Sequence, residues 1–436
     1  MFSKLLIANR GEVAVRIIRA CKEMGIATVA VYSAADRDCL HVALADQCVC
    51  IGEAEAAGSY LDAGRIVSAA LVTGAGAVHP GYGFLSESAD FAALCRKHGL
   101  AFVGPSEEAI TLMGDKSEAR RFMQRSGVPV APGTDILRDT DEAAGAAEAI
   151  GYPVLVKARA GGGGRGIRLV RTPEELEGAF FTASQEARAA FGDGAVYLEK
   201  FVSPARHVEV QILADEAGHV VCLGERECSI QKNHQKLIEE SPSPAVSAAL
   251  RAKLTETAAQ AAKAAGYVGA GTVEFLLDAK QNFYFMEMNV RLQVEHAVTE
   301  FVTGIDLVKW QIRVAAGVPL DFTQADVRLT GSSIECRINA AAAGTVSMLH
   351  VPGGPWVRFD SALFTGCRVP PYYDALLGKL VVRAGTREEA GRKLQAALCE
   401  LVIDGVPSNI DEQLAVLTDP RFCRGEYDTD FFREDE

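Results

Sequence analysis

Residues 4–32 follow a strand–helix–strand pattern, which limits the possible folds more than any other feature of the chain. LLIAN (5–9) and ATVAVY (27–32) are short apolar runs, and GEVAVRIIRACKEMG (11–25) has apolar residues at helical spacing before a closing glycine. Strands joined by a helix usually pair in parallel, with helices on the faces of the sheet. The turn after the first run reads NRGE rather than GxGxxG, so a dinucleotide-binding function loses its main support.

Length, charge and cysteine usage exclude several classes of protein. A chain of 436 residues is too long for one hydrophobic core, so two or three domains are expected. The net charge of −13 argues against nucleic acid or an anionic membrane as the main partner. No apolar run approaches a membrane span, and MFSKLLIANRGE lacks the features of a signal peptide. Eleven scattered cysteines without a CxxC pair indicate reduced thiols, as in a cytoplasmic protein.

The rest of the chain alternates between strand-like and helical segments. Alternation typical of α/β structure continues to about residue 110, and a new unit begins near MGDKSEARRFM (113–123). Helices are expected over about 173–190, 244–265 and 300–316, with strand-rich stretches between them. The last hundred or so residues mix both kinds of pattern. We therefore expect an α/β protein with α+β parts.

Four consecutive glycines, Gly161 to Gly164, separate the strand-like runs YPVLVKA and IRLV. One interpretation is a flexible hairpin tip without a ligand. The other is a phosphate clamp, because glycine lets backbone N–H groups approach an anion and Lys157 supplies positive charge nearby. The spacing is not that of a Walker loop. A glycine flap between antiparallel strands is instead a feature of the ATP-grasp fold.

An acidic pair is predicted on two neighbouring strands. If residues 271–278 and 283–290 form a hairpin, Glu274 and Glu287 face each other with Cβ atoms about 5 Å apart. Two carboxylates this close repel unless a cation lies between them or one is protonated. Mg²⁺ suits such a pair, and Asn289 offers a further oxygen. A protonated or lysine-bridged pair is the alternative.

The same region continues as an alternating stretch, FYFMEMNVRLQVEH (283–296). Its polar residues share one parity and therefore one face of an extended chain: Glu287, Asn289, Arg291, Gln293 and Glu295. A straight strand would separate the first and last by roughly 26 Å, at about 3.3 Å per residue. That is too far for one small ligand. The face is either solvated, or bent, or shared by several ligands.

These features, with several other motifs, resemble the biotin carboxylase component of biotin-dependent carboxylases of the bacterial acetyl-CoA carboxylase type. The resemblance covers nearly the whole chain, and the order and spacing of its motifs make it specific. The motifs are IANRGE (7–12), SAADRDCLHVALAD (33–46), HPGYGFLSE (79–87), MGDK (113–116), KARAGGGGRG (157–166), RHVEVQ (206–211), ERECSIQKNHQK (225–236), EMNVRLQVEH (287–296), ECRINA (335–340) and PPYYD (370–374).

The resemblance implies an ATP-grasp fold with an N-terminal Rossmann-like parallel-sheet domain and a C-terminal mixed α/β domain. The implied domains are residues 1–113, the ATP-grasp domain at 114–330 with a mobile glycine-flap subdomain at about 131–203, and the C-terminal domain at 331–436.

The resemblance also implies a role for individual residues. Those implied to bind ATP are Lys116, Lys157, Gly163, Gly164, Glu199, Lys200, Val202, His207, Gln231 and His234, with Lys236 reaching the terminal phosphate. Those implied to hold Mg²⁺ or Mn²⁺ are Glu274, Glu287 and Asn289. Those implied to act on bicarbonate and biotin are Arg291, Gln293 and Val294 for bicarbonate, Glu295 as general base, Arg337 at the biotin enolate, and Tyr82 and Gly83 beside biotin.

The implied reaction is the first half-reaction of acetyl-CoA carboxylase or a related acyl-CoA carboxylase. ATP and bicarbonate would form carboxyphosphate, which carboxylates biotin on a separate biotin carboxyl carrier protein for use by carboxyltransferase subunits. A homodimer is implied because Arg19 and Glu23 match interface positions, although an i,i+4 pair within one helix explains them equally well. The alternatives are another ATP-grasp ligase and a non-catalytic nucleotide-binding subunit. A segment after Ala340 that is shorter than in the family motivates the second.

Overall fold

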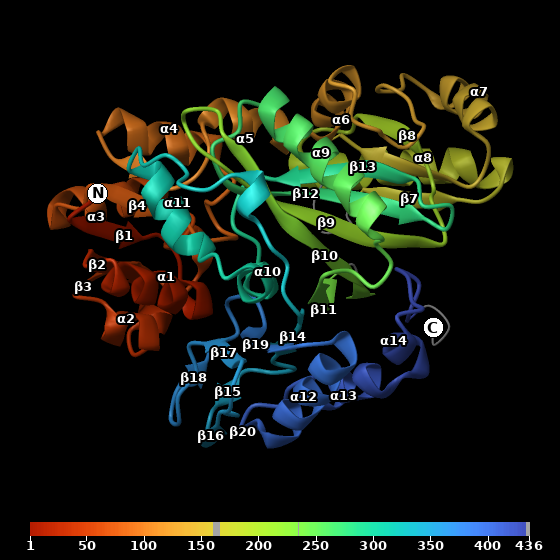
Figure 1. Ribbon diagram of the computed structural model, residues 1–436. Helices are drawn as coiled ribbons and strands as arrows, with labels where there is room; N and C mark the ends of the chain where they lie inside the picture. The colour runs from red at the N-terminus through yellow and green to blue at the C-terminus, as the bar shows by residue number, and fades with distance from the viewer. Residues whose placement is uncertain (160–165, 234, 433–436) are drawn as a thin grey trace.

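The computed structural model describes residues 1–159, 166–233 and 235–432. The N-terminal elements lie on the left in Figure 1, a long sheet crosses the centre, and the C-terminal helices lie below. None of the helices in the described ranges combines the length and apolar character that a membrane span requires. All eleven cysteines lie in these ranges and carry free thiols.

The N-terminal region is a five-stranded parallel sheet in the order β3-β2-β1-β4-β5. Its strands are β1 (Lys4–Ile7), β2 (Ala27–Ser33), β3 (Gln47–Gly52), β4 (Ala77–His79) and β5 (Ala101–Phe102). Its helices are α1 (Gly11–Glu23), α2 (Leu40–Leu44), α3 (Ala63–Thr73), α4 (Ala89–Lys97) and α5 (Glu107–Gly114), with short 3-10 turns η1 (Ala34–Asp36) and η2 (Ala56–Gly58). Leu5 and Ile7 pack with Val13 and Ile17 of α1 in one core, which confirms the predicted βαβ opening.

A separate three-stranded antiparallel sheet follows α6 (Lys116–Arg125) and contains the two strands predicted on either side of the four glycines. Its elements are β6 (Val154–Ala158), β7 (Ile167–Val170) and β8 (Val196–Lys200), with helices α7 (Thr140–Ile150) and α8 (Pro173–Phe191). Val154 and Val156 are buried in the core of this unit, so the intervening Leu155 and the following Lys157 point to the other face. The predicted hairpin is confirmed, and its four glycines lie outside the described residues.

The central sheet has eight strands that pair antiparallel in the order β13-β12-β9-β10-β11-β14-β19-β17. The strands are β9 (Ala205–Ala214), β10 (Val220–Lys232), β11 (Gln235–Ser241), β12 (Gly269–Asp278), β13 (Phe283–Asn289), β14 (Ser332–Asn339), β17 (Val357–Ser361) and β19 (Leu376–Ala384). Helix α9 (Ala248–Ala264) packs on β9 and β10. Because β11 pairs with β14, the C-terminal strands extend the same sheet that holds the acidic hairpin.

The remaining C-terminal elements cover one side of β14 and β19, where α12 packs. They are β15 (Gly344–Thr345), β16 (Met348–His350), β18 (Arg368–Val369), α12 (Arg387–Glu400), β20 (Val402–Asp404), α13 (Ile410–Thr418) and α14 (Pro420–Arg424). Ile334, Cys336 and Ile338 of β14 face this core together with Leu394 of α12. The alternate residues of β14 therefore point to the opposite face, toward the centre of the molecule.

The prediction of one helix over 300–316 was wrong. The chain forms α10 (His296–Thr303) and α11 (Leu307–Ala315), followed later by the turn η3 (Gln324–Asp326). Gly304 has a φ of 74° and ends α10 in a left-handed conformation that glycine adopts without strain. Asp306 then accepts a hydrogen bond from the backbone N–H of Lys309 at 2.9 Å and starts the second helix.

Candidate active site

One cavity of about 850 Å³ lies where the N-terminal region, the flap sheet and both halves of the central sheet meet. Its walls include Asn9 and Tyr82 from the N-terminal region, Lys157 from β6, His207 from β9, Lys236 from β11, Glu274 from β12 and Arg337 from β14. The volume is in the range of small-molecule sites. Segments far apart in the sequence thus supply one concave surface.

The hairpin β12–β13 carries the acidic pair in the predicted register. Glu274 lies opposite Glu287, and the register shifts by one residue directly after this pair. The two carboxylates have different partners. Glu274 is 2% exposed and accepts a hydrogen bond from Asn289 Nδ2 at 2.7 Å, whereas Glu287 pairs with Lys116 Nζ at 2.8 Å. Each carboxylate of the pair therefore has its own lysine: Lys236 contacts Glu274, and Lys116 contacts Glu287.

The polar residues after Asn289 do not continue the strand. β13 ends at Asn289, and the chain turns before α10 begins at His296. The turn brings Arg291 Nη1 within 3.0 Å of Gln293 Oε1 and Arg291 Nη2 within 3.2 Å of Asn289 Oδ1. A bent chain thus gathers amide and guanidinium groups that a straight strand would have spread apart.

Lys236 is the centre of an ion-pair network. Its Nζ lies 2.6 Å from Glu209 Oε2, 3.0 Å from Glu274 Oε1 and 2.7 Å from Glu295 Oε1. Burial opposes the charged ammonium, but the three carboxylates outweigh it and hold the pKa of Lys236 well above its usual range. Glu209 has a second partner, because its Oε1 accepts from Arg226 Nε at 2.5 Å. One ammonium therefore serves three acids.

Arg337 joins this network from β14. Its Nη2 lies 2.9 Å from Glu295 Oε2, and its Nε donates to Glu239 Oε1 at 2.6 Å. Burial disfavours the ionised form of Glu295, but Lys236, Arg337 and Arg226 overcome it and hold its pKa well below the usual range. Glu295 is thus an ionised carboxylate held between two cations. The short segment after Ala340 does not keep Arg337 from this position.

Five of the residues predicted to bind ATP line the cavity, and Glu199 bonds one of them. Lys157 Nζ lies 2.6 Å from Glu199 Oε2, and His207 lies between Glu274 Oε2 at 2.8 Å and Gln231 Nε2 at 2.7 Å. Lys116, Lys157, Val202, His207 and Gln231 line the cavity. Lys200 points elsewhere, because its Nζ donates to the carbonyls of Gly151 and Tyr152 at 2.8 and 3.0 Å. Gly163, Gly164 and His234 lie outside the described residues.

Three residues predicted to act on bicarbonate or biotin belong to the same cavity. Tyr82, Gly83 and Val294 line it. The hydroxyl of Tyr82 donates to Glu12, and the carbonyl of Val294 accepts from the buried ammonium of Lys379. These contacts fix the backbone that would face a substrate.

The donor set on β12 and β13 fits a hard divalent cation. Glu274 and Glu287 supply carboxylate oxygens from directly opposed positions, and Asn289 offers an amide oxygen that here accepts from Arg291. Oxygen donors of this kind are those that Mg²⁺ prefers, usually with water and substrate phosphates completing the shell. Bound phosphates would also offer Lys116 and Lys236 alternative anionic partners.

The comparisons with known proteins agree with this geometry. Residues 1–110 match the biotin carboxylase N-terminal domain, residues 115–323 the ATP-binding domain of the carbamoyl-phosphate synthase L chain, and residues 334–434 the biotin carboxylase C-terminal domain. Biotin carboxylase of Nostoc is 54% identical over 442 residues, covering 99% of each chain. Biotin carboxylase 1 of Bacillus subtilis is 52% identical, covering 99% of this chain and 98% of that one.

The chain belongs to the biotin carboxylase family.

Solved biotin carboxylase structures share the backbone as well. The Campylobacter jejuni biotin carboxylase, crystallised as a β-γ-ATP complex, is 48% identical with a TM-score of 0.97 and covers 100% of this chain and 99% of that one. The biotin carboxylase domain dimer of Hydrogenobacter thermophilus 2-oxoglutarate carboxylase contains MgADP, ADP and bicarbonate. It is 48% identical with a TM-score of 0.96, covering 100% of this chain and 98% of that one. The predicted family and the ATP-grasp fold are confirmed.

Several residues of this biotin carboxylase site were not predicted. Glu87 lies 3.2 Å from Arg291 Nε, Glu209 bonds Lys236, and Glu239 bonds Arg337. Glu87 and Glu209 are in the motifs HPGYGFLSE and RHVEVQ, so a search of those motifs for carboxylates could have found them. Glu239 lies in a strand without such a signal. Only the pairing of β11 with β14 brings it to Arg337.

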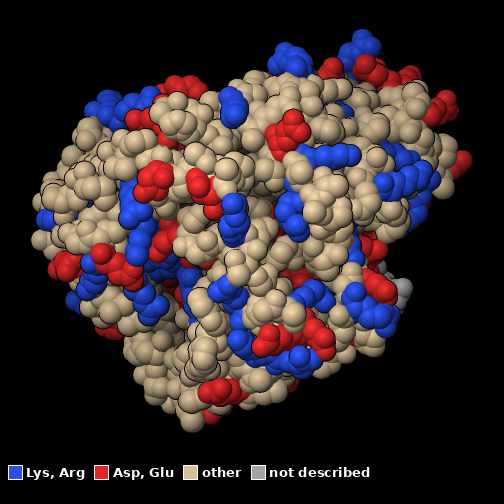
Figure 2. All heavy atoms as spheres, in the orientation of Figure 1, with Lys and Arg blue, Asp and Glu red and all other residues tan. Residues whose placement is uncertain are grey.

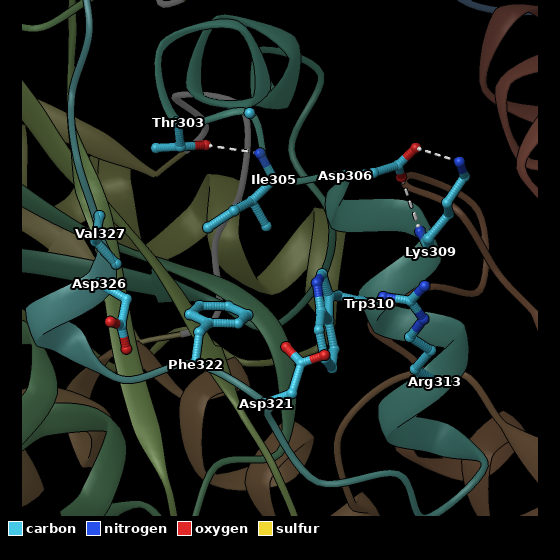
Figure 3. A pocket seen from close by; sticks show the side chains of 11 residues that line it. Thr303, Ile305, Asp306, Lys309, Trp310, Arg313, Asp321, Phe322, Asp326 and Val327 are labelled. Carbon is cyan, nitrogen blue, oxygen red and sulfur yellow. Dashed lines mark hydrogen bonds and ion pairs between the residues drawn. The ribbon is translucent and has the colours of Figure 1, made fainter.

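A second cavity of about 430 Å³ contains none of the residues predicted for the biotin carboxylase site. Figure 3 shows Trp310 and Phe322 facing each other, with Arg313 beside Trp310 and Asp306 bonded to Lys309. On the face shown in Figure 2, acidic and basic side chains of the described residues are interspersed.

Proposed function

We propose that the large cavity catalyses the ATP- and bicarbonate-dependent carboxylation of biotin on a separate carrier protein, through carboxyphosphate. The chain is a biotin carboxylase, an ATP-dependent ligase that forms ADP and a C–N bond. The observation that carries the residue assignments is the contact of Lys236 with both Glu274 and Glu295. It links the acidic hairpin, the lysine for the terminal phosphate and the proposed base in one network.

Bicarbonate would bind beside the turn after β13. Arg291 supplies positive charge there, Gln293 an amide, and Val294 backbone groups, all at the wall of the cavity. Glu295 would accept the proton of bicarbonate, because its carboxylate is ionised and lies at the same turn. The bicarbonate oxygen would then attack the terminal phosphate of ATP.

Phosphoryl transfer depends mainly on positioning and charge neutralisation. Lys236 would contact the terminal phosphate, and Lys116 of α6 and Lys157 of β6 the other phosphates. Glu274, Glu287 and Asn289 would hold Mg²⁺ or Mn²⁺, which when bound neutralises phosphate charge. Glu199 holds Lys157 in place at 2.6 Å.

Carboxyphosphate would release CO₂ and phosphate, and that phosphate would take the proton from the ureido nitrogen of biotin. Arg337 would stabilise the negative charge that develops on the ureido oxygen. Tyr82 and Gly83 line the wall that would face biotin. Binding of both reactants in one cavity would let CO₂ be captured before it escapes.

The partners follow from the same proposal. Biotin would arrive on a biotin carboxyl carrier protein, and carboxyltransferase subunits would pass the carboxyl group to the final acceptor, as in acetyl-CoA carboxylase or a related acyl-CoA carboxylase. A homodimer is proposed from the interface positions Arg19 and Glu23. Glu23 pairs with Lys309 Nζ at 2.5 Å rather than with Arg19. The domain boundaries after residues 113 and 330 and the cytoplasmic location stay predictions.

The decisive experiment measures ADP release with MgATP and bicarbonate, with and without free biotin. The wild-type protein should respond to biotin, and Glu295→Gln should lose that response by a factor on the order of 10² to 10⁴. Glu388→Gln is the matched control, because Glu388 is an exposed glutamate on α12. ADP release driven by an amino acid instead of bicarbonate would indicate another ATP-grasp ligase. Tight ATP binding without turnover, even with a biotinylated carrier, would indicate a non-catalytic subunit.

A further inference from the structure

Glu335 is a buried carboxyl group that the proposed mechanism does not use. It lies on β14, is 0% exposed, and neither of its oxygens has a hydrogen-bond partner among the described residues. Buried carboxyl groups are normally hydrogen-bonded, because burial without a partner costs free energy. Glu335 lies two residues before Arg337 on the same strand, and a carboxyl group without a partner at this position needs a physical explanation.

The sheet register places a second carboxyl group directly beside it. Glu335 is the cross-strand partner of Glu239 on β11. Glu239 is also 0% exposed, and its Oε2 has no partner in the part of the chain that the structure describes, while its Oε1 accepts from Arg337. Directly opposed residues of an antiparallel pair have Cβ atoms about 5 Å apart. Two buried carboxyl groups at this spacing resist carrying two negative charges.

The surroundings of the pair are charged on several sides. The titratable and charged groups that face Glu335 are Glu239 on β11, Arg337 on β14, Lys379 on β19, Glu295 at the start of α10, and Tyr82, with Glu12 and His296 beside Lys379. Burial is the largest influence and raises the pKa of Glu335 well above its usual range, with Lys379 opposing. Burial also raises the pKa of Glu239 to about 7.

We propose that Glu335 and Glu239 share one proton, and that this pair is a positioning device for Arg337 in the biotin-dependent step. The shared proton leaves the pair with one negative charge. That charge fixes the guanidinium through Glu239 and places no second negative charge of the pair beside it. Loss of the proton would add a second negative charge beside Arg337 and weaken its attraction for the developing ureido oxyanion.

The inference rests on the proposed function, because it assigns the effect to the step at biotin. It predicts that biotin-dependent ADP release falls as the pH rises and the pair loses its proton. In Glu335→Gln the pair carries at most one negative charge at any pH, because Gln mimics the protonated acid and only Glu239 can ionise. The variant should therefore keep its rate at high pH.

The experiment is a pH profile of ADP release between pH 6 and 9.5 with free biotin as the probe. Relative to the wild type, Glu335→Gln should move the alkaline decline upward by about one pH unit or more. Glu388→Gln, exposed on α12, should leave the profile unchanged. An unchanged alkaline limb in Glu335→Gln, or an equal loss of rate at every pH, would overturn the proposal.

Infrared difference spectroscopy gives a readout that does not need turnover. At pH 8 the wild type minus Glu335→Gln spectrum should contain the carbonyl band of a protonated carboxylic acid, and its absence would also overturn the proposal. If biotin never stimulates ADP release, the proposed function fails while this spectrum still tests the shared proton. If Glu335→Gln does not fold, Glu335→Asp replaces it, because a shorter side chain separates the two carboxyl groups. The alkaline decline of ADP release in Glu335→Asp should then lie at a different pH from that of the wild type. An unchanged decline would overturn the proposal.

Discussion

Two buried ion-pair networks of this protein use similar residues in different ways. The cavity network joins Lys236 and Arg337 to the carboxylates of β9, β11, β12 and the start of α10. The second network lies outside the cavity, where Arg16 of α1 and Arg358 of β17 hold Glu300 of α10. Both cross between regions that are far apart in the sequence.

The networks differ in how their carboxylate oxygens are satisfied. Glu300 Oε1 accepts from Arg16 at 2.9 Å and Oε2 from Arg358 at 2.7 Å, and Asp360 receives both of its hydrogen bonds from Arg358. In and beside the cavity network, by contrast, one ammonium is divided among three carboxylates, and three oxygens of the buried Glu239 and Glu335 have no partner among the described residues. A donor shared among several carboxylates can exchange one of them for a ligand. The second network, called saturated here because each oxygen of Glu300 and Asp360 accepts a hydrogen bond, instead holds structural elements together.

The largest expected effect comes from a substitution in the cavity network, and it is an effect on catalysis. Lys236→Gln should lower bicarbonate-dependent ADP release by a factor on the order of 10² to 10³, because the terminal phosphate loses its cation. Steady-state kinetics measures this. Arg16→Gln, in the saturated network, is the comparison and should keep the KM for ATP. Equal losses of turnover in the two folded variants would show that the two networks do not differ in function.

The next effect is on stability. Glu300→Gln should destabilise the fold by about 3–5 kcal/mol, because Arg16 and Arg358 would be left buried without their shared anion. Urea unfolding at pH 7 measures the change. A loss below about 1 kcal/mol would mean that the saturated network contributes no more than a surface pair.

A smaller effect is expected from pH. Arg16 and Arg358 overcome burial and hold the pKa of Glu300 well below its usual range, so its folded pKa is below the unfolded one. Its stabilisation is therefore present above about pH 4.5 and is lost as the pH falls toward the folded pKa. The wild type should lose more stability than Glu300→Gln between pH 6 and 4, measured by urea unfolding. Parallel losses would contradict this assignment.

The smallest effect is expected on the surface. Arg392 and Glu388 of α12 form an i,i+4 pair, and both side chains are mostly exposed. Glu388→Gln should change the free energy of unfolding by less than about 0.5 kcal/mol, since solvent screens such pairs. Thermal unfolding measures the change. A fall of several degrees in the melting temperature would show that this exposed pair contributes more to stability than its exposure indicates.

Local patterns predicted the parts of the site that depend on neighbouring residues. The register that sets Glu274 opposite Glu287 followed from a short hairpin connection, because loop length controls which residues of an antiparallel pair face each other. The alternating polar residues after Asn289 were found as well, but not their turn. The division of residues 300–316 into two helices was missed, since a glycine inside an apolar pattern can be tolerated or can end a helix.

The sequence by itself determined the α/β class, the glycine hairpin, the acidic pair and, through its motifs, the family. Each of these depends on residues close together in the chain or on their order. Only the tertiary structure decided that Lys236 serves three carboxylates and that Glu239 lies beside Glu335. The Lys236 contacts join residues 27 to 59 positions apart in the chain, and the strands that carry Glu239 and Glu335 pair across a much longer stretch of sequence. Pairing at that range is set by packing of the whole sheet, which no local pattern encodes.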